Sequence, residues 1–221
     1  MHYDVQKIIN TCPQIKKVLY LRICDSTNQM ARELAEDAEP EFSLVLTDRQ
    51  IAGRGRMGRY WLHDAEDGIA MSLLLRPKMP TTALPMMTLA AALAVHSALD
   101  TVAGIRAEIK WPNDILYQGK KICGILTEGV IDGENTYAVL GIGMNVNQTE
   151  IPDELSDTAV SLRMITGKTF RREEMIAGIV NAFSGYYGIF QRDGDLRNLY
   201  EKYNQFCLKN SRINEKGEQI T

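Results

Sequence analysis

The stretch QIAGRGRMGR, residues 50–59, combines the two residue types that bind anions most readily. Its glycines let backbone N–H groups approach a ligand closely. Its arginines, Arg54, Arg56 and Arg59, can each hold a carboxylate or a phosphate through paired hydrogen bonds. The stretch therefore predicts an anion site. The alternative is a mobile basic loop without a ligand, because many glycine-rich loops are only flexible.

Neither of the familiar nucleotide-binding loops explains these glycines. Gly53, Gly55 and Gly58 match the dinucleotide pattern GxGxxG, but that pattern requires a helix directly afterwards. The following residues, RYWLHDAEDG, do not have a helical pattern. The phosphate-loop pattern GxxxxGK[ST] is absent, since no lysine followed by Ser or Thr comes after the last glycine.

Three further motifs place polar residues at the ends of apolar strands. KWPND, residues 110–114, could order a magnesium-bound polyphosphate, or it could be a fixed turn closed by Asn and Asp. In KKICGIL, Lys121 starts a buried strand and Gly124 leaves space nearby, so the lysine could neutralise a carboxylate and a phosphoryl oxygen together. In GIGMNVN, Asn145 and Asn147 follow two glycines, which predicts that a ligand can reach the backbone there.

The elements that must position these motifs begin with a strand over residues 18–24. A helix follows, and the hydroxyls of Ser26 and Thr27 either cap it or face a site at the end of the strand; capping alone is the simpler interpretation. Residues 42–47 predict the strand that leads into the arginine-rich loop, and residues 68–75 predict a buried strand after it. The loop is thus expected between two core strands.

The rest of the chain predicts one long helix, a run of antiparallel strands and two final helices. The long helix covers residues 81–102, and His96 within it is expected to be a packing or surface residue, not a catalytic base. The strands are expected at 106–111, 115–117, 121–130 and 136–147, with turns at 118–120 and 132–135. The last helices are expected at 173–190 and 195–207, after a polar stretch at 148–157 that is the one plausible break.

Composition places the chain among cytoplasmic, soluble proteins. Its 221 residues, 45% of them hydrophobic, can form one sizeable core. A net charge of −3 disfavours non-specific binding to nucleic acid, and the four scattered cysteines include no CxxC pair. The N-terminus does not resemble a signal peptide, and no stretch is expected to be long enough to cross a membrane. The residues before position 18 are too few for a DNA-binding module.

Taken together and in this order, five motifs resemble those of the biotin protein ligases. They are STNQ (26–29), QIAGRGRMGR (50–59), KWPND (110–114), KKICGIL (120–126) and GIGMNVN (141–147). The likeness covers roughly residues 18–206. Lipoate ligases share the general fold but not this arginine loop.

The resemblance implies an α/β fold of the α+β type, with a mixed, mainly antiparallel sheet flanked by helices, as in class II aminoacyl-tRNA synthetase cores. Residues 1–206 would form the catalytic domain. Residues 207–221 would be a short C-terminal tail or the remnant of a small β-barrel domain. The chain would be of the monofunctional type, without an N-terminal DNA-binding domain.

The resemblance also implies a reaction. ATP and Mg²⁺ would activate biotin as biotinyl-5'-AMP, and the biotinyl group would pass to a lysine of a biotin carboxyl carrier protein domain of a carboxylase. Two alternatives remain: a lipoate or octanoate acyl-adenylating ligase, and a catalytically weak biotin-binding module. Neither nucleic acid nor a membrane is expected as a partner. The oligomeric state stays open, a homodimer included, as do the metal ligands.

The site residues follow from the matching motif positions. Biotin would contact Ser26, Thr27, Asn28, Gln50, Gly53, Arg54, Gly55, Arg56, Lys121 and Gly124. ATP would contact Arg54, Arg56, Arg59, Lys110, Asn113, Asp114 and Asn145. Lys121 and Arg56 would be catalytic, and the arginine loop would close over biotin as a lid.

Elementary chemistry agrees with such a reaction. Adenylyl transfer depends on positioning and on positive charge near the phosphorus, which Arg56 and Lys121 can supply. No histidine or cysteine nucleophile is needed. A hydrolytic triad is disfavoured, because Ser26 has no histidine nearby in sequence and the GxSxG pattern is missing.

Overall fold

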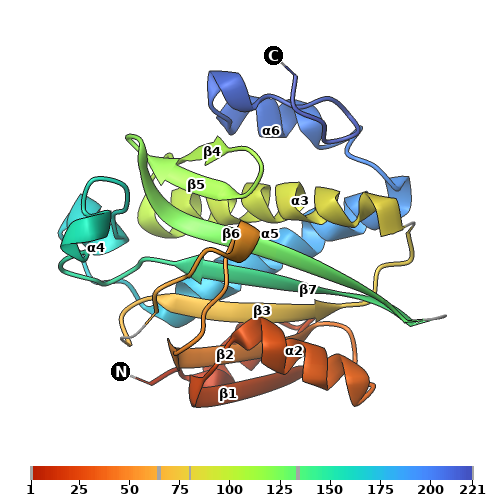
Figure 1. The fold of residues 1–221 in the computed structure, drawn as a ribbon, viewed down its shortest axis with the longest axis horizontal. Coiled ribbons are helices and arrows are strands. Elements are labelled where there is room, and N and C mark those ends of the chain that lie inside the picture. Colours follow the sequence, from red (N-terminus) through yellow and green to blue (C-terminus); the bar gives the residue numbers. More distant parts are fainter. Residues whose placement is uncertain (1, 64–65, 80, 133–134, 221) are drawn as a thin grey trace.

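The computed structural model describes residues 2–63, 66–79, 81–132 and 135–220, and its centre is a seven-stranded sheet (Figure 1). The strand order is β1-β2-β3-β7-β6-β5-β4. The strands are β1 (Lys17–Cys24), β2 (Ser43–Gln50), β3 (Ile69–Leu75), β4 (Glu108–Lys110), β5 (Asp114–Tyr117), β6 (Lys120–Asp132) and β7 (Asn135–Met144). β1 and β2 are parallel, and the other neighbouring pairs are antiparallel. This confirms the expected mixed, mainly antiparallel sheet.

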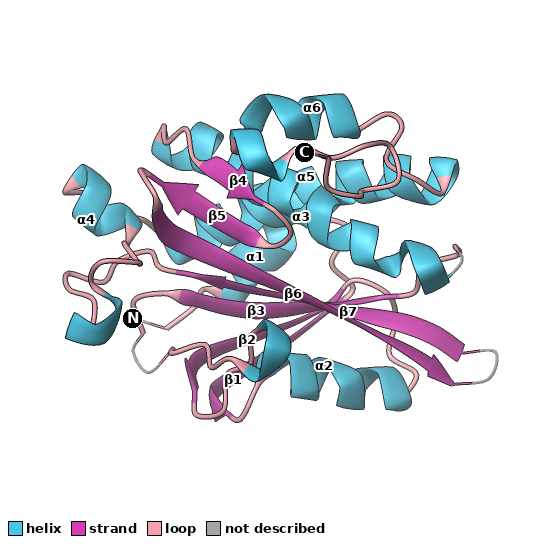
Figure 2. Cartoon of the chain, turned by 45° about the horizontal axis from the view of Figure 1, so that its top comes forward, coloured by secondary structure: helices cyan, strands magenta, loops and turns pink. Residues whose placement is uncertain are grey.

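Helices cover both faces of the sheet. They are α1 (Val5–Thr11), α2 (Thr27–Glu36), α3 (Leu84–Ala98), α4 (Leu162–Thr166), α5 (Arg172–Asp193) and α6 (Tyr200–Phe206). Figures 1 and 2 show α2 on one face of the sheet and α3 with α5 on the other. The site motifs lie on the α2 side, where the sheet is only partly covered.

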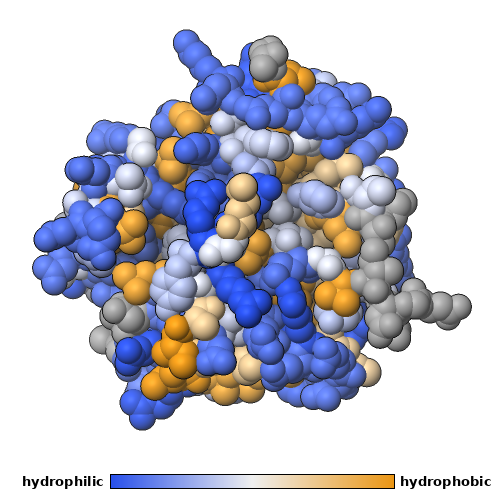
Figure 3. Space-filling model, viewed as in Figure 1, coloured by the Kyte–Doolittle hydropathy of each residue, from blue (hydrophilic) through white to orange (hydrophobic). Residues whose placement is uncertain are grey.

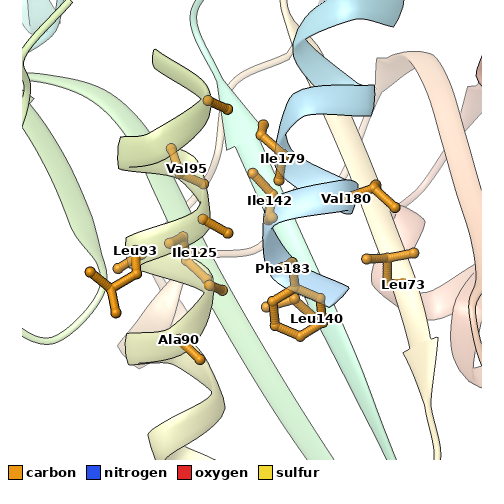
Figure 4. Packing of buried hydrophobic residues seen from close by; sticks show 14 of the residues in the cluster. Leu73, Ala90, Leu93, Val95, Ile125, Leu140, Ile142, Ile179, Val180 and Phe183 are labelled. Atoms are coloured by element: carbon orange, nitrogen blue, oxygen red, sulfur yellow. The ribbon is translucent and has the colours of Figure 1, made fainter. Parts of the chain in front are cut away.

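Successive side chains of a β-strand point to opposite faces of the sheet, which explains these two layers. In β2, Leu44 and Leu46 belong to the large core beneath α3 and α5, whereas Val45 belongs to the smaller core beneath α2. Figure 4 shows Leu140 and Ile142 of β7 among side chains of α3 and α5. Each such fully buried aliphatic side chain contributes about 1.5–3 kcal/mol relative to exposure. The core therefore fixes the sheet that carries the site.

α3 corrects two expectations. With the π-helical turn that follows it, the helix runs over Leu84–Ala103 and is long and apolar enough to span a membrane by length and composition. Here it is a core helix, buried against the sheet and α5. It begins at Leu84 instead of residue 81, and Pro85 occupies its first turn, where a missing N–H costs nothing.

His96 of α3 is a packing residue, as the sequence predicts. Its ring stacks on Phe206 of α6, with ring centroids 4.0 Å apart. Burial lowers the pKa of His96, so the neutral imidazole is favoured in the core.

Several boundaries differ from the sequence-based expectations. The last helix covers only Tyr200–Phe206, because Asp195 accepts a hydrogen bond from the Arg197 backbone N–H and forms a turn instead. The short helices α1 and α4 were not predicted. The turn at 118–120 is confirmed, since Gln118 and Gly119 both have positive φ. The turn expected at 132–135 includes residues outside the described part of the chain.

The polar stretch at 148–157 is not a boundary within the described chain. The residues that follow it return to the sheet, where Lys121 N donates to Thr158 O at 2.7 Å and Val160 N donates to Lys121 O at 3.0 Å. The described C-terminal residues also fold back, since Leu208 N donates to Ile109 O at 3.0 Å. Their assignment as a tail or a barrel remnant stays a prediction.

Candidate active site

One pocket on the α2 side of the sheet collects most of the predicted site residues. Those in its wall are Ser26, Thr27, Asn28, Gln50, Arg54, Gly55, Arg56, Arg59, Asn113, Asp114, Lys121 and Gly124. In Figure 3, strongly hydrophilic side chains gather at the centre of this face, where the arginine loop crosses β6 in Figure 1. Segments about 100 residues apart in sequence thus form one site.

The arginine loop is folded as a short hairpin, which we call the arginine hairpin (residues 50–63). Its rungs are Gln50 N to His63 O at 2.7 Å, Trp61 N to Gly53 O at 2.9 Å and Gly55 N to Arg59 O at 2.7 Å. Its tip is a 3₁₀ turn (η1, Arg56–Gly58) in which Met57 and Gly58 have positive φ. Residues 59–63, directly after the glycines, form no helix, which agrees with the rejection of the dinucleotide pattern.

Gly53 supports the hairpin and does not line the pocket. A Cβ atom at this position would lie 2.3 Å from the carbonyl oxygen of Trp61. Any side chain would therefore force the two hairpin strands apart. Its assignment as a biotin contact stays a prediction.

Trp61 closes the pocket over the glycines of the sheet. A Cβ atom on Gly143 would lie 2.3 Å from the indole ring, and one on Gly124 would lie 3.0 Å from it. The Lys121 ammonium lies 5.3 Å from the centre of one indole ring. The space that the sequence assigned to a ligand above GIGMNVN is thus occupied by a side chain in this structure.

The polar wall of the pocket is formed where β1 ends and α2 begins. Thr27 donates to the Gln50 amide oxygen through its backbone N–H at 2.8 Å, and its hydroxyl oxygen lies 3.1 Å from the same atom. Ser26 is the N-cap of α2, but its side chain makes no capping hydrogen bond. The simpler interpretation, in which these hydroxyls only cap the helix, is therefore not supported. Because the Gln50 amide oxygen accepts from Thr27, the amide nitrogen is left as a donor for the pocket.

The cationic side of the pocket joins β5, β6 and the arginine hairpin. Lys121 Nζ lies 2.7 Å from Asp114 Oδ1, and both side chains are partly exposed. Asn113 donates to Ile125 O at 3.2 Å and accepts from the Arg56 guanidinium at 3.5 Å. KWPND is thus both a fixed turn and part of the site.

Lys110 and Asn145 are not in the wall of this pocket. Lys110 is exposed at the end of β4. Asn145 lines a neighbouring hollow with His63, Asp67 and Gln148. The assignment of both residues to the nucleotide stays a prediction.

Cys123 lies in the core behind Lys121. Its side chain is fully buried, and burial raises the pKa of the thiol strongly. The thiol is therefore held protonated, and it is not a nucleophile for the site.

Several residues of the pocket wall were not among the site residues predicted from the sequence. Tyr60 and Trp61 of the arginine hairpin and Met71 of β3 are among them. Gly141 and Gly143 of β7, where the sequence predicted that a ligand could reach the backbone, also line the pocket. A usable signal was present for Gly141 and Gly143, because two glycines at a spacing of two lie on the same face of a strand. Nothing local in the sequence indicated which side chains would fill that face.

Comparisons with known proteins find relatives over most of the chain. A family model described as the biotin/lipoate A/B protein ligase family matches residues 20–145. The chain is 43% identical over 191 residues to a bifunctional ligase/repressor BirA of Bacillus spizizenii, covering 84% of this chain and 59% of that relative. It is 38% identical over 167 residues to a biotin--[acetyl-CoA-carboxylase] ligase of Paracoccus denitrificans, covering 72% of this chain and 68% of the relative.

A solved structure shares the fold. The biotin protein ligase from Aquifex aeolicus in complex with biotin and ATP superposes with a TM-score of 0.77 at 34% identity, covering 88% of this chain and 79% of that one. The chain spans 59% of the length of the Bacillus relative.

Proposed function

Because the chain belongs to the biotin/lipoate A/B protein ligase family, we propose that it activates biotin with ATP and transfers it to a carrier protein. One observation carries the proposal: a single pocket holds the polar wall of Thr27 and Gln50 at one side and the cations Lys121 and Arg56 at the other. A molecule with a polar head and a carboxylate tail fits such a pocket. Biotin has this form.

The reaction has two steps. A biotin carboxylate oxygen attacks the α-phosphorus of ATP, and the bond to the bridging oxygen breaks, which gives biotinyl-5'-AMP and pyrophosphate. The ε-amine of a carrier lysine then attacks the acyl carbon of the mixed anhydride. AMP leaves, the amine loses a proton, and an amide bond joins biotin to the carrier.

The residues of the pocket divide into two tasks. Ser26, Thr27, Asn28 and Gln50 hold the head group, with the Gln50 amide nitrogen as a donor. Lys121 neutralises the biotin carboxylate and then the charge that builds up on the phosphoryl oxygens. The remaining rate acceleration comes from holding the two reactants in contact, because adenylyl transfer depends mainly on positioning.

The nucleotide would lie along the arginine hairpin. Arg54, Arg56 and Arg59 provide cations for the phosphates, and Asn113 lies within reach of Arg56. The neighbouring hollow with Asn145 begins at the base of the same hairpin, at His63, and offers room for the rest of the nucleotide.

Mg²⁺ fits this site mainly as a partner of the phosphates. Asp114 is the one carboxylate among the described residues of the pocket wall, and it already pairs with Lys121. A cage of protein ligands is thus not formed here. When bound, Mg²⁺ would neutralise phosphate charge while keeping several waters, as it usually does.

The acceptor and the location follow from the same proposal. The Paracoccus relative is named a biotin--[acetyl-CoA-carboxylase] ligase, which supports a carrier domain of a carboxylase as the acceptor. All four cysteines are free thiols, which supports a cytoplasmic location. An arginine hairpin that closes as a lid also belongs to the proposal.

The test is an assay of pyrophosphate release with the purified chain, ATP and Mg²⁺. We expect release that depends on biotin and transfer of biotin to a carrier domain. Tighter binding and faster activation of lipoate or octanoate would instead support the acyl-ligase alternative. Stoichiometric biotin binding without pyrophosphate release would support the binding module.

A variant of the hairpin tests its role in keeping the intermediate. We expect Arg56→Gly to release biotinyl-5'-AMP roughly 10- to 100-fold faster, because hydrogen bonds to charged groups contribute about 1.5–3 kcal/mol. Dissociation of a labelled adenylate measures this. Arg22→Ala is the matched control, since Arg22 is exposed on β1 outside the pocket. Unchanged dissociation from the Arg56 variant would contradict the role.

A further inference from the structure

Asn28 is seated across three strands of the sheet. Its amide oxygen accepts a hydrogen bond from the Ser72 hydroxyl of β3 at 2.6 Å. Its amide nitrogen donates to the Glu128 carboxylate of β6 at 2.7 Å. Between them lies Gly141 of β7, where a Cβ atom would be 2.2 Å from the Asn28 amide oxygen. Asn28 can therefore reach the sheet only because position 141 is a glycine.

Glu128 is fixed from its other side. Its carboxylate forms an ion pair and a hydrogen bond with Arg32, which lies one helical turn beyond Asn28 on α2. Glu128 is not in the wall of the biotin pocket, and it takes no part in the proposed reaction. It lies in an adjoining hollow under the tip of the arginine hairpin.

The carboxylate decides the direction of a whole series of hydrogen bonds. An ionised carboxylate only accepts, so the Asn28 amide must point its nitrogen toward Glu128 and its oxygen toward Ser72. Ser72 has one hydroxyl proton and must give it to that oxygen. The Ser72 oxygen, 2.8 Å from the Thr27 hydroxyl, is then left as an acceptor.

This series of hydrogen bonds, from Glu128 through Asn28 and Ser72, ends at Thr27 in the pocket wall. The Thr27 hydroxyl gives its one proton to the Ser72 oxygen, so the Thr27 oxygen is left as an acceptor in the pocket wall. The Thr27 backbone N–H holds the Gln50 amide oxygen at 2.8 Å, which leaves the Gln50 amide nitrogen as a donor. We propose that Glu128 is a positioning residue that sets which pocket atoms donate and which accept, and so selects the cyclic urea of biotin. This inference rests on the proposed function, because it takes biotin as the ligand.

Glu128→Gln is the sharpest variant, because it keeps the size of the side chain and removes its acceptor-only character. A glutamine can donate or accept, so the Asn28 amide loses its fixed orientation. We expect biotin to bind roughly 5- to 15-fold more weakly, equivalent to losing one or two well-oriented hydrogen bonds. We expect the rate of adenylate formation at saturating biotin to change less than about threefold.

The experiment combines calorimetric titration without ATP and single-turnover kinetics with ATP. Biotin and desthiobiotin share the cyclic urea and should lose affinity by the same factor, whereas binding of lipoate, which lacks it, should not change. Ser72→Ala should weaken biotin similarly, and the double variant should be no weaker than either single variant, because both act on one series of hydrogen bonds. Glu33→Gln, an exposed glutamate of α2, is the control.

The possible results distinguish the positioning role of Glu128 from the proposed biotin-ligase function. Unchanged biotin affinity in Glu128→Gln, or equal losses for biotin and lipoate, would overturn the positioning role. Additive losses in the double variant would overturn it too, and thermal unfolding of the variants shows whether they remain folded. If the wild-type chain binds biotin but forms no adenylate, the proposed function is wrong. The role of Glu128 is then still judged by the ratio of biotin affinity between wild type and variant.

Discussion

Lys121→Ala should slow formation of biotinyl-5'-AMP by about 30- to 1000-fold, or about 2–4 kcal/mol in barrier height, comparable to the loss of one oxyanion donor. The ammonium lies beside the pocket glycine Gly124, and in the proposed reaction it would provide charge where the phosphoryl oxygens become more negative. Its removal also takes away the cation that pairs with Asp114, beside the position proposed for the phosphates. Single-turnover mixing with ATP and excess biotin measures the step directly.

Two further variants isolate that effect. Lys120→Ala changes the adjacent lysine, which donates to Ser156 O and lies outside the pocket, and it should keep the wild-type rate. Adding Asp114→Asn to Lys121→Ala should restore part of the lost rate if repulsion by the unpaired carboxylate contributes. A normal single-turnover rate for Lys121→Ala would refute its catalytic role.

Asp48→Asn should cost about 3–5 kcal/mol of unfolding free energy, because it removes the carboxylate charge that pairs with the buried Arg172 guanidinium. The two side chains are 3% and 5% exposed, with Arg172 Nη2 3.3 Å from Asp48 Oδ1. The guanidinium also stacks on Tyr3 and donates to Gly68 O, where the arginine hairpin leads into β3. Urea unfolding measures the loss.

A more exposed ion pair is the control for this variant. Lys7 and Glu174 lie 2.7 Å apart but are 30% and 50% exposed, so Glu174→Gln should change stability by less than about 1 kcal/mol. Equal effects of the two substitutions would show that burial does not make the Asp48–Arg172 ion pair more stabilising than an exposed pair.

The same carboxylate predicts how stability depends on pH. Burial by itself would raise the pKa of Asp48, but hydrogen bonds from Tyr20 and His2 and the charge of Arg172 lower it below its usual value. A lowered folded-state pKa means that the stabilisation is complete above the ordinary value of about 3.9 and is lost as the pH falls through the folded-state pKa. Wild type should therefore lose stability in that acidic range, and Asp48→Asn should lack this component.

The strands and the motifs could be predicted from the sequence because both are local signals. The apolar runs of β3 and β7 specify strands without reference to the rest of the chain. The start of α3 and the extent of α6 were less accurate. At α6 the reason is local, because Asp195 accepts from the Arg197 backbone N–H and redirects the chain before the helix. The parallel pairing of β1 with β2 was not predicted, since pairing depends on contacts between distant segments.

The candidate site was predicted unevenly for the same physical reason. Residues within motifs, such as Thr27, Gln50 and Lys121, do line one pocket. The contact between Asn28 and Glu128 joins positions 100 residues apart, and it exists only because strand register places Gly141 opposite Ser72. Periodicity along the chain carries no information about such a partner.

The position of Trp61 over Gly143 gives the molecule a built-in optical reporter. The chain contains two tryptophans: Trp61 in the pocket wall, and Trp111 beside the C-terminal residues, where its indole donates to Gly217 O at 3.4 Å. Emission on selective tryptophan excitation therefore comes from these two positions alone. With Trp111→Phe, a single indole next to Lys121 would remain, so occupancy of the pocket could be followed in real time without any label.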